Sequence, residues 1–424
     1  MLRLNIDSLD WALEHALNYG DTSMFPLPFE YGAIKHDWSD VRNFLAAQDV
    51  LAWVVRPHRT MLSPKARFGF RVITQLDPLD FLIYAALIKE IGPDIETTRI
   101  GSDKVFSYRC LIGASGQLFD TAIGYSEFKT RTEQILDEDP NISYVVLTDI
   151  SDFYPRIYSH RLENALHNAT HSTSHVKAIM RLISGWNSSE SFGIPVGNAP
   201  SRLLAEATIS NVDDALLAYG VRFVRYTDDY RIFARNYSQA YRHLAYLADV
   251  LYRTQGLTLQ PQKTLIVSTA DFRRRFLREP EEHELDSLSD KFRVLLEELG
   301  LEDLYGVIEY SDLDPEQQSL VDSLNLIEIF REEVGKSDPD LALIRFVLSR
   351  MGQLGDDALV DDALNNLNSL HSVFPSIITY LRNLRNISAA RRAEIGRQVL
   401  RLLDDSLISE LDYHRMWALV TGDN

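Results

Sequence analysis

The amino-acid sequence predicts an α+β region followed by an all-α region. In the middle of the chain, apolar runs that favour strands, at 144–148 and 221–226, are separated by stretches with helical periodicity, as in an α+β domain. After Pro280 the sequence changes to long segments rich in Leu, Asp, Glu and Arg, which indicates helices. A chain of 424 residues exceeds one ordinary domain of about 100 to 200 residues, so the two regions are expected to form separate domains.

The elements suggest three segments in chain order. Residues 1–60 alternate short amphipathic stretches with Pro and Gly, and we expect helices and loops that lead into a sheet. Residues 61–275 form the α+β segment, in which Asp77 and Pro78 are expected to begin a helix over 80–90. Further helices are expected at 161–186 and 201–218, and a β-hairpin at 221–234. Residues 276–424 form the third segment.

The third segment contains successive helical stretches of similar length, which are expected to pack as antiparallel neighbours. They lie at 341–351, 358–370, 377–384 and 391–403. Their similar lengths favour a helical-repeat array of the HEAT type, but no residue recurs at a fixed period, so a plain bundle is an equal alternative. Either arrangement is expected to be a scaffold or interaction domain rather than a site of chemistry.

Charge is distributed unevenly along the chain. The formal net charge is -18, but residues 1–280 hold 30 Lys and Arg against 32 Asp and Glu, whereas residues 281–424 hold 13 against 29. The near-neutral region can carry a basic groove, because phosphate binding depends on local charge. The acidic region is unsuited to nucleic acid, and we expect it to mediate self-association or contacts with other proteins.

Composition excludes several classes of protein. A hydrophobic share of 45% and a charged share of 25% are average for folded soluble proteins and exclude disordered and low-complexity chains. No stretch approaches the roughly 18 apolar residues of a membrane span, and acids near the N-terminus do not suit a secretory signal, so we expect a cytoplasmic protein without a membrane partner. The single cysteine, Cys110, can form neither an internal disulfide nor a structural zinc site.

Carboxylates follow strand-like runs at two places in the α+β segment. Asp149 ends the run at 144–148, and Asp228 and Asp229 occupy the turn of the hairpin. A single Asp of this kind would be a cap or turn residue. If the strand that ends at Asp149 pairs beside the hairpin, the carboxylates converge at one sheet edge and repel one another unless a cation is present. Mg²⁺ prefers such oxygen ligands together with substrate phosphates, and two such ions support phosphoryl transfer.

Four motifs, in this order and spacing, resemble the palm of reverse transcriptases over roughly 65–267. They are 147–157, Gly193-Ile-Pro-Val-Gly-Asn-Ala-Pro-Ser201, Tyr226-Thr-Asp-Asp229 and Gly256-Leu-Thr-Leu-Gln-Pro-Gln-Lys-Thr264, corresponding to motifs A to D. Four ordered motifs are far more specific than a lone short pattern. The resemblance implies the right-hand polymerase fold with fingers and palm, the helical segment replacing a standard thumb, and an RNA-directed DNA polymerase (a nucleotidyltransferase) that uses dNTPs and Mg²⁺, with Mn²⁺ as an alternative.

The resemblance also implies roles for single residues near the metals. Asp149 and Asp228 would be the principal metal ligands, with Asp229 as the accompanying carboxylate and the backbone carbonyl of Ile150 completing a metal shell. Lys263 matches the lysine of motif D, which can give a proton to the leaving pyrophosphate. Its alternative reading is a surface lysine at a turn.

A further set of residues would bind the nucleotide. The set consists of Lys65, Arg67, Arg71, Asp152, Phe153, Tyr154, Pro195, Val196 and Gly197. The basic residues resemble the fingers cluster that grips the triphosphate, because charge builds on phosphate oxygens in the transition state. Tyr154 stands at the position where a bulky ring excludes a ribose 2′-hydroxyl, which implies deoxynucleotides. For Phe153, packing after a strand has equal weight.

Motif B departs from the common family pattern, because Val196 stands where most reverse transcriptases have Gln. With Val196, the segments 105–109, 201–206 and 212–214 resemble bacterial abortive-infection and defence-associated reverse transcriptases. That resemblance implies antiphage defence, a cognate non-coding RNA, a DNA product and a homo-oligomer formed through the helical domain. Arg202 and Glu206 would lie on the motif B helix, where a helix salt bridge is favoured over substrate contact.

Alternatives remain open at this point. Members of that group either copy an RNA or make DNA without a template from a protein hydroxyl; the missing Gln weakens template reading, while the basic cluster 273–278 could hold RNA backbone. A catalytically decayed RNA-binding scaffold is a different class of function, and the intact Asp149, Asp228, Asp229 and Lys263 oppose it. A retron-type enzyme would need a more basic segment than 279–301.

Overall fold

The computed structural model describes residues 1–66, 69–187, 190–277, 318, 325–385, 387–404 and 406–420. The chain forms two compact units. The first consists of Met1–Thr60 and Ile73–Arg278, and the second of Met61–Val72 and Glu279–Asn424. Among the described helices, none combines the length and the apolar composition that a membrane crossing requires.

The first unit begins with helices, as the sequence predicts for residues 1–60. They are α1 (Ile6–Tyr19), α2 (Glu30–His36), α3 (Trp38–Ala47) and the short 3-10 helix η1 (Val50–Ala52). Helix α1 packs against α4 (Pro78–Thr97). The predicted start of α4 is confirmed, because Asp77 caps the helix by accepting a hydrogen bond of 2.9 Å from the amide of Leu79.

Helices α5 (Tyr125–Glu138), α7 (Ser159–Ala169), α8 (Thr173–Trp186), α9 (Ala199–Ala218) and α10 (Tyr237–Val250) complete the helical layer of the first unit. The single helix expected over 161–186 is wrong, because the chain breaks between α7 and α8. Thr170 is extended there, with φ -135° and ψ 148°. Its hydroxyl accepts from the amide of Ser172 at 3.2 Å and donates to the carboxylate of Asp94, so local side-chain bonds replace the helical ones.

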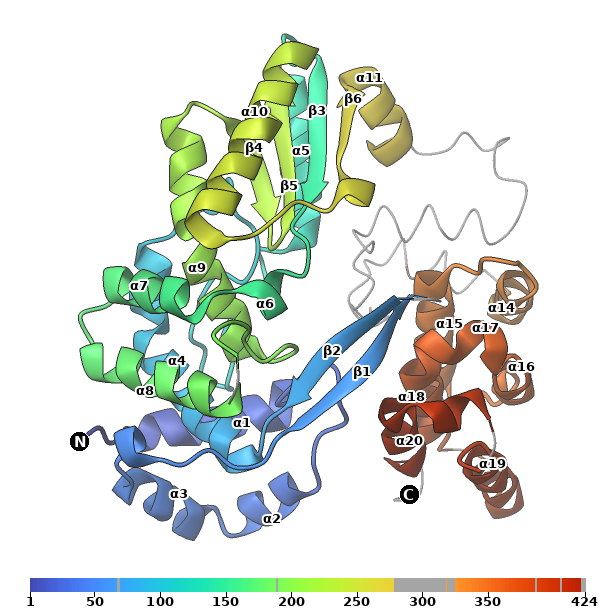
Figure 1. The fold of residues 1–424 in the computed structure, drawn as a ribbon. Coiled ribbons are helices and arrows are strands. Elements are labelled where there is room, and N and C mark those ends of the chain that lie inside the picture. Colours follow the sequence, from blue (N-terminus) through green and yellow to red (C-terminus); the bar gives the residue numbers. More distant parts are fainter. Residues whose placement is uncertain are drawn as a thin grey trace. The chain divides into compact units, whose positions relative to one another are not determined.

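The strands form an antiparallel sheet in the order β4-β5-β3-β6. Their bounds are β3 (Tyr144–Asp149), β4 (Arg222–Tyr226), β5 (Asp229–Ala234) and β6 (Leu265–Ser268). Strand β3 lies beside the β4–β5 hairpin, with Tyr144 opposite Ala234 and Asp149 opposite Asp229. The predicted strand, hairpin and pairing of the two acidic segments are therefore confirmed (Figure 1).

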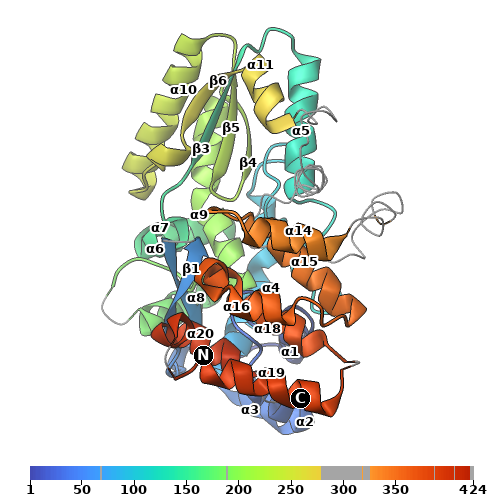
Figure 2. The same ribbon diagram turned by 90° about the vertical axis from the view of Figure 1, so that its right-hand side faces the viewer.

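The sheet is buried on both faces. Helix α10 packs on one face, against β3, β5 and β6, while α5 contacts β4 and α11 (Thr269–Phe272) contacts β3 and β6 (Figure 2). Because side chains alternate along a strand, Val146 joins the large core shared with α4, α8 and α9, while Val145 joins a smaller core with Phe128 and Phe272. This burial on both faces explains why the sequence of β3 is a continuous apolar run up to its last residue, Asp149.

Short elements surround the end of β3. They are α6 (Phe153–Arg156), the π-helical turn η2 (Leu251–Gln255), the 3-10 helix η3 (Pro261–Lys263) and the π-helical turn η4 (Arg273–Leu277). A two-stranded hairpin, β1 (Arg59–Ala66) and β2 (Gly69–Gln75), precedes α4. Residues 61–72 of this hairpin group with the second unit.

Apart from the hairpin residues 61–72, the second unit is helical over its described residues, as the sequence predicts for the third segment. The helices are α14 (Leu326–Val334), α15 (Leu341–Leu354), α16 (Val360–Asn365), α17 (Leu367–Leu370), η7 (His371–Val373), α18 (Phe374–Asn383), α19 (Ala389–Arg401), η8 (Leu407–Glu410) and α20 (Asp412–Leu419). Helices α15 and α18 pack closely around Phe346, Val347 and Ile378, and the sequence had predicted both. The choice between a repeat array and a bundle stays a prediction.

Candidate active site

Three aspartates converge where β3 ends beside the β4–β5 hairpin. Asp149 is the last residue of β3 and lies opposite Asp229, the first residue of β5. Asp228 precedes Asp229 in the turn, and its backbone carbonyl accepts a hydrogen bond of 3.0 Å from the amide of Ile150. This bond ties the turn to the chain just beyond Asp149, so the carboxylates cannot drift apart without breaking the sheet edge.

The clustering of negative charge changes the protonation of Asp228. Burial and then the neighbouring carboxylate of Asp149 raise the pKa of Asp228 from 3.8 to about 7, with Asp229 adding to the shift. Without a cation, one of these carboxylates is therefore half-protonated near neutral pH. A divalent cation would relieve the repulsion that causes the shift.

Lys263 supplies one positive charge at this edge. Its ammonium Nζ lies 2.9 Å from Oδ2 of Asp149, whose side chain is 14% exposed, while the side chain of Lys263 is 53% exposed. Burial acts to lower the pKa of Lys263, but the bond to Asp149 and the charges of Asp228 and Asp229 outweigh it, so the net shift is upward. The lysine is held protonated beside the carboxylates, as a proton donor would need to be.

The segment that carries Lys263 is fixed to the end of β3 by main-chain hydrogen bonds. The amide of Gln260 donates to the carbonyl of Asp149 at 2.7 Å, and the amide of Ser151 donates to the carbonyl of Thr258 at 2.9 Å. The Ser151 hydroxyl also donates to Oε1 of Gln260 at 3.1 Å. Motifs A and D are thereby joined, and η3 presents Lys263 toward Asp149.

The chemistry of these donors suits a hard divalent cation. Mg²⁺ is usually held by one or two carboxylates, with waters and substrate phosphates supplying the remaining oxygens. Among the described residues, no group of three or more His, Cys, Asp and Glu side chains is arranged to hold a metal by itself. Metal binding by Asp149, Asp228 and the carbonyl of Ile150 stays a prediction, and the amide of Ile150 is bonded to the carbonyl of Asp228.

The motif A residues after Asp149 differ in exposure. Asp152 is exposed and adopts the left-handed backbone region at φ 47° as it starts α6. Phe153 is buried in the large core, which favours the packing role. Tyr154 is half-buried beside it, with ring centroids 5.5 Å apart. Burial first, and then Tyr108 and Asp228, keep the pKa of Tyr154 well above its usual value, so the phenol stays neutral.

The motif B loop adopts a fixed conformation before α9. Gly193 and Gly197 have φ +91° and +114°, where glycine is favoured, and a Cβ on Gly197 would lie 2.5 Å from Oγ1 of Thr22. The carbonyl of Val196 accepts from the amide of Thr74 at 3.2 Å, and that of Pro195 accepts from the Asn198 side chain at 3.3 Å. The loop is thus anchored by its backbone, which explains why Val can stand at position 196 without loss of loop structure.

The predicted fingers residues lie on the β1–β2 hairpin. Arg67 lies outside the described residues. Lys65 and Arg71 are half-buried and belong to the segment that groups with the second unit. In that unit Arg71 contributes to the electrostatic surroundings of Tyr413, whose hydroxyl is hydrogen bonded with Ser63. Contact with a triphosphate stays a prediction for all three basic residues.

A fully buried ion cluster lies behind the hairpin turn. Glu206 of α9 accepts hydrogen bonds from Arg99 at 2.6 Å and from Arg225 of β4 at 3.0 and 3.2 Å, and from the Ser107 hydroxyl at 2.6 Å. Asp213 accepts from Arg225 at 2.9 and 2.5 Å. Burial acts to raise the pKa of Glu206, but Arg225 and Arg99 outweigh it and hold the pKa below its usual value. Glu206 is thus ionised and satisfied.

The cluster grips the turn that carries Asp228. Arg225 donates from Nη1 to the carbonyl of Thr227 at 2.8 Å, and the amide of Thr227 donates to the Ser107 hydroxyl at 2.8 Å. Thr227 has φ 55°, which is unfavourable for a β-branched residue. Such a conformation persists only where the surroundings determine it. The cluster supplies those surroundings directly before Asp228 and Asp229.

The sequence analysis missed most of this cluster. The predicted helix salt bridge for Glu206 is wrong in its partners, because Arg99 and Arg225 both lie outside α9. Arg202 instead donates to the Ser23 hydroxyl at 2.8 Å and lies over the Tyr108 ring. One pattern could have revealed Arg225: a charged residue in the middle of an apolar strand must find a buried partner.

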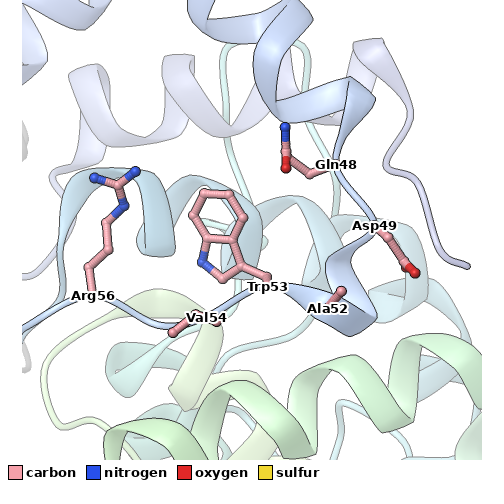
Figure 3. A pocket seen from close by; sticks show the side chains of 6 residues that line it. All are labelled: Gln48, Asp49, Ala52, Trp53, Val54 and Arg56. Carbon is pink, nitrogen blue, oxygen red and sulfur yellow. The ribbon is translucent and has the colours of Figure 1, made fainter.

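Two surface hollows lie among the described residues, and the three carboxylates are absent from the lining of each. A hollow of about 440 Å³ is lined by Gln48, Asp49, Ala52, Trp53, Val54 and Arg56 (Figure 3). Trp53 there donates to the buried Asp80 at 2.8 Å, so its indole holds α4 to the N-terminal segment. A second hollow, of about 480 Å³, lies in the helical unit. Neither hollow is lined by a residue of the predicted site.

The chain can be compared with curated proteins and with solved structures. No curated protein matches the chain. Among solved structures, telomerase from Candida albicans, in complex with a TWJ fragment of telomeric RNA, is 12% identical with a TM-score of 0.38, over 94% of this chain and 71% of that one. Apo telomerase from Candida tropicalis is 10% identical with a TM-score of 0.41, over 93% and 74%. Both TM-scores are low, so neither structural similarity indicates the function of this chain.

One family model matches, under the description reverse transcriptase (RNA-dependent DNA polymerase), over residues 69–295. The matched range contains Asp149, Asp228, Asp229 and Lys263. It also contains the sheet and both glycine turns of the motif B loop. Because the match spans more than half of the chain, this protein belongs to the reverse transcriptase family and carries its RNA-directed DNA polymerase domain.

Proposed function

We propose that the protein is a Mg²⁺-dependent DNA polymerase of antiphage defence, which polymerises dNTPs on a cognate non-coding RNA. The observation that carries the polymerase activity is the convergence of Asp149, Asp228 and Asp229 at one sheet edge with Lys263 beside them. The defence role rests on the motif B variant with Val196 and on the resemblance of the segments around it. Mn²⁺ is the alternative metal.

The residues of the site have distinct roles in this proposal. Mg²⁺, when bound with a dNTP, supplies charge stabilisation at the reacting phosphate. Asp149, Asp228 and the carbonyl of Ile150 would hold it, and Asp229 adds negative charge. Lys263 would give a proton to the leaving pyrophosphate, and the raised pKa that keeps its ammonium protonated beside Asp149 supports this role.

The nucleotide would be bound by the remaining residues of the predicted set. The charge of Asp228 contributes to the raised pKa of Tyr154. The ring of Tyr154 would exclude a ribose 2′-hydroxyl by its bulk. The motif B backbone, at Val196 and Gly197, would bound the same space. Lys65, Arg67 and Arg71 are proposed to bind the triphosphate.

The polymerase assignment has a direct test. Replacing Asp228→Ala together with Asp229→Ala is expected to abolish incorporation of labelled dNTPs and to preserve the fold, since neither side chain belongs to the apolar core. The matched control is Asp361→Ala with Asp362→Ala, an adjacent pair in α16 of the helical unit, which should retain activity. Incorporation by the Asp228/Asp229 variant would refute the site, whereas a parent protein without incorporation would favour the decayed-scaffold alternative.

The main alternative is template-independent synthesis primed from a protein hydroxyl. Exposure narrows the candidates among the described tyrosines. The most exposed are Tyr19, Tyr158, Tyr219, Tyr237, Tyr241 and Tyr252. Co-purified nucleic acid should be sequenced before and after addition of Mg²⁺ and labelled dNTPs. New DNA complementary to a bound RNA supports the templated reaction, whereas DNA attached covalently to the protein supports the alternative.

Two further expectations belong to this proposal. The helical segment, from about residue 276, would take the place of a thumb, after an N-terminal segment 1–60 and a fingers and palm segment 61–275. Self-association through the helical segment rests on the resemblance to defence-associated enzymes. Size-exclusion chromatography with light scattering tests this self-association, and a monomer at micromolar concentration would exclude it.

A further inference from the structure

The acidic helical unit contains one strongly basic segment. Residues 281–424 hold 13 Lys and Arg against 29 Asp and Glu, yet residues 382–401 hold six Arg and a single acid, Glu394. The segment runs from the end of α18 through α19. The overall acidity of the unit therefore hides a local reversal of charge, and local charge decides where an anion binds.

Three of these arginines surround one hollow. The hollow has a volume of about 480 Å³ and lies between the end of α18 and the first turn of α19. It is lined by Thr379, Arg382, Asn383, Leu384, Arg385 and Arg392. All three guanidinium-bearing side chains are exposed, so the hollow is open to a ligand from solvent.

These arginines differ from others in the same unit because they lack acidic partners. Arg331 pairs with Asp362 at 2.8 Å, and Arg391 pairs with Asp361 at 2.9 Å. By contrast, no carboxylate of the described residues lies within ion-pair distance of Arg382, Arg385 or Arg392. Converging like charges repel one another, so an anion in the hollow lowers the free energy of the arrangement.

The start of α19 strengthens the positive potential. The first turn of this 13-residue helix contains no acid, although acids are favoured there because they offset the positive end of the helix dipole. It carries Arg391 and Arg392 instead. Ser388 caps the helix by accepting from the amide of Arg391 at 3.2 Å, and the acidic partners of Arg391 neutralise its side chain, so Arg392 is the residue of this turn that adds positive charge to the hollow.

The lining indicates the class of ligand. Planar guanidiniums bind phosphate oxygens in pairs and so recognise phosphate better than single point charges do. No aromatic side chain lines the hollow, so nothing is available to stack a nucleobase. We propose that Arg382, Arg385 and Arg392 form a sequence-independent site for the phosphodiester backbone of single-stranded nucleic acid. The proposal does not depend on catalysis or on the choice of template.

The test is a binding measurement on the full chain without metal or dNTPs. A labelled single-stranded oligonucleotide is titrated at several salt concentrations and followed by fluorescence anisotropy. The variant Arg382→Gln, Arg385→Gln, Arg392→Gln is expected to reduce the slope of log Kd against log salt by about 2, since each single-strand phosphate contact contributes about 0.7. Affinity at low salt should fall at least about tenfold by the same counterion argument.

The matched control removes the same charge elsewhere in the unit, by Arg331→Gln, Arg401→Gln and Arg415→Gln. It should keep the parent slope, and circular dichroism should show equal helix content in all three proteins. An unchanged slope in the first variant, or an equal loss in the control, would overturn the site. Inorganic triphosphate serves as a competitor: if the first variant loses triphosphate binding but keeps oligonucleotide binding, the ligand is a free polyphosphate and the backbone proposal fails.

Because the measurement omits Mg²⁺ and dNTPs, its outcome is independent of the polymerase assignment. A variant of Asp228 and Asp229 that cannot incorporate nucleotides should still bind the oligonucleotide with the parent slope. Conversely, an active polymerase with an unchanged slope in the arginine variant would leave the assignment intact and remove the site.

Discussion

Two groups of carboxylates flank the same hairpin and have opposite surroundings. Glu206 and Asp213 are fully buried, and each is bonded to a guanidinium at 3.2 Å or less. Asp149 and Asp228 are only half-buried, and the cation beside them is Lys263, which is itself more than half exposed. Arg225 and Arg99 lower the pKa of Glu206, whereas burial raises the pKa of Asp213 and of Asp228, and at Asp228 the neighbouring carboxylates raise it further.

This contrast separates structural carboxylates from those able to bind a metal. A buried carboxylate whose oxygens all accept from arginines has no lone pair directed at a ligand, and its charge is already balanced. A carboxylate with too little positive charge around it is destabilised until a cation arrives. The first group binds Arg225, which in turn donates to the carbonyl of Thr227, whereas Asp228, one residue further on, has a raised pKa that a cation would relieve.

The largest expected effect concerns the buried group. Arg225→Met leaves Glu206 and Asp213 without their shared partner, and removing one side of a buried ion pair costs about 3 to 5 kcal/mol of unfolding free energy. The turn at Thr227 also loses its bond from Nη1. Urea unfolding should show the loss, and incorporation should fall in proportion to the remaining folded protein or further.

Arg222→Met is the matched control for that variant. Arg222 lies on the same strand but is 39% exposed, and it pairs with Glu138 and Asp139 at 3.3 Å. Exposed pairs of this kind contribute about 0.2 to 1 kcal/mol. Equal destabilisation by the two substitutions would contradict the view that burial distinguishes them.

The second prediction is a gain in stability rather than a loss, and it concerns the substitution of Asp228. In the metal-free protein its pKa is raised from 3.8 to about 7, so the folded state binds this proton more tightly than the unfolded chain does. The resulting stability is fully present below about pH 4 and is lost as the pH rises toward 7. Asp228→Asn removes this loss and is expected to stabilise the metal-free protein at about pH 8 by up to about 4 kcal/mol, since each pKa unit corresponds to about 1.4 kcal/mol.

Two comparisons test the Asp228→Asn prediction. The stability difference between variant and parent should shrink to nearly zero as the pH falls to about 4, because the parent carboxyl is then protonated in both states. Adding Mg²⁺ and a dNTP should raise the Tm of the parent and leave that of the variant unchanged. A variant that is less stable at every pH, or that gains equally from the metal, would show that Asp228 resembles the structural group.

The sequence could predict the half-buried group, Asp149 and Asp228, but only part of the fully buried one. Asp149 and Asp228 each follow an apolar strand directly, so a local pattern and one pairing assumption place them together. Arg99, Glu206 and Arg225 come from separate elements, with Arg99 and Glu206 107 residues apart. Their contact depends on how α9 packs behind the hairpin, and no local pattern encodes that packing.

Helix ends likewise could be predicted where neighbouring residues determine them, and they were missed where a residue distant in sequence determines them. The start of α4 is predicted because Asp77 and Pro78 act within one turn. The break before α8 was missed because Thr170 is held by Asp94, a residue of another helix. The arginine hollow was likewise obscured, since the net charge of a region averages over residues that the fold separates.

The smallest expected change in stability belongs to Lys263, and it is paired with a large change in rate. The pair of Lys263 with Asp149 is half-exposed, so Lys263→Met should cost less than about 1 kcal/mol of unfolding free energy. Loss of a positioned proton donor is expected to slow incorporation by about 10² to 10⁴-fold. Single-turnover incorporation, with stability measured on the same preparation, separates the two effects.

Lys263→Arg decides whether the proton or only the charge matters. Arginine can keep an ion pair with Asp149 but does not lose its proton at accessible pH. Because the pKa of Lys263 is raised, the parent rate should be insensitive to Lys263 through neutral pH and fall only in strongly alkaline buffer as the ammonium deprotonates. If proton donation is the role, Lys263→Arg should be nearly as slow as Lys263→Met and lack that alkaline fall. Full activity in Lys263→Arg would leave charge neutralisation of Asp149 as the whole contribution, and Lys263 would then act on the carboxylates as Arg225 acts on Glu206.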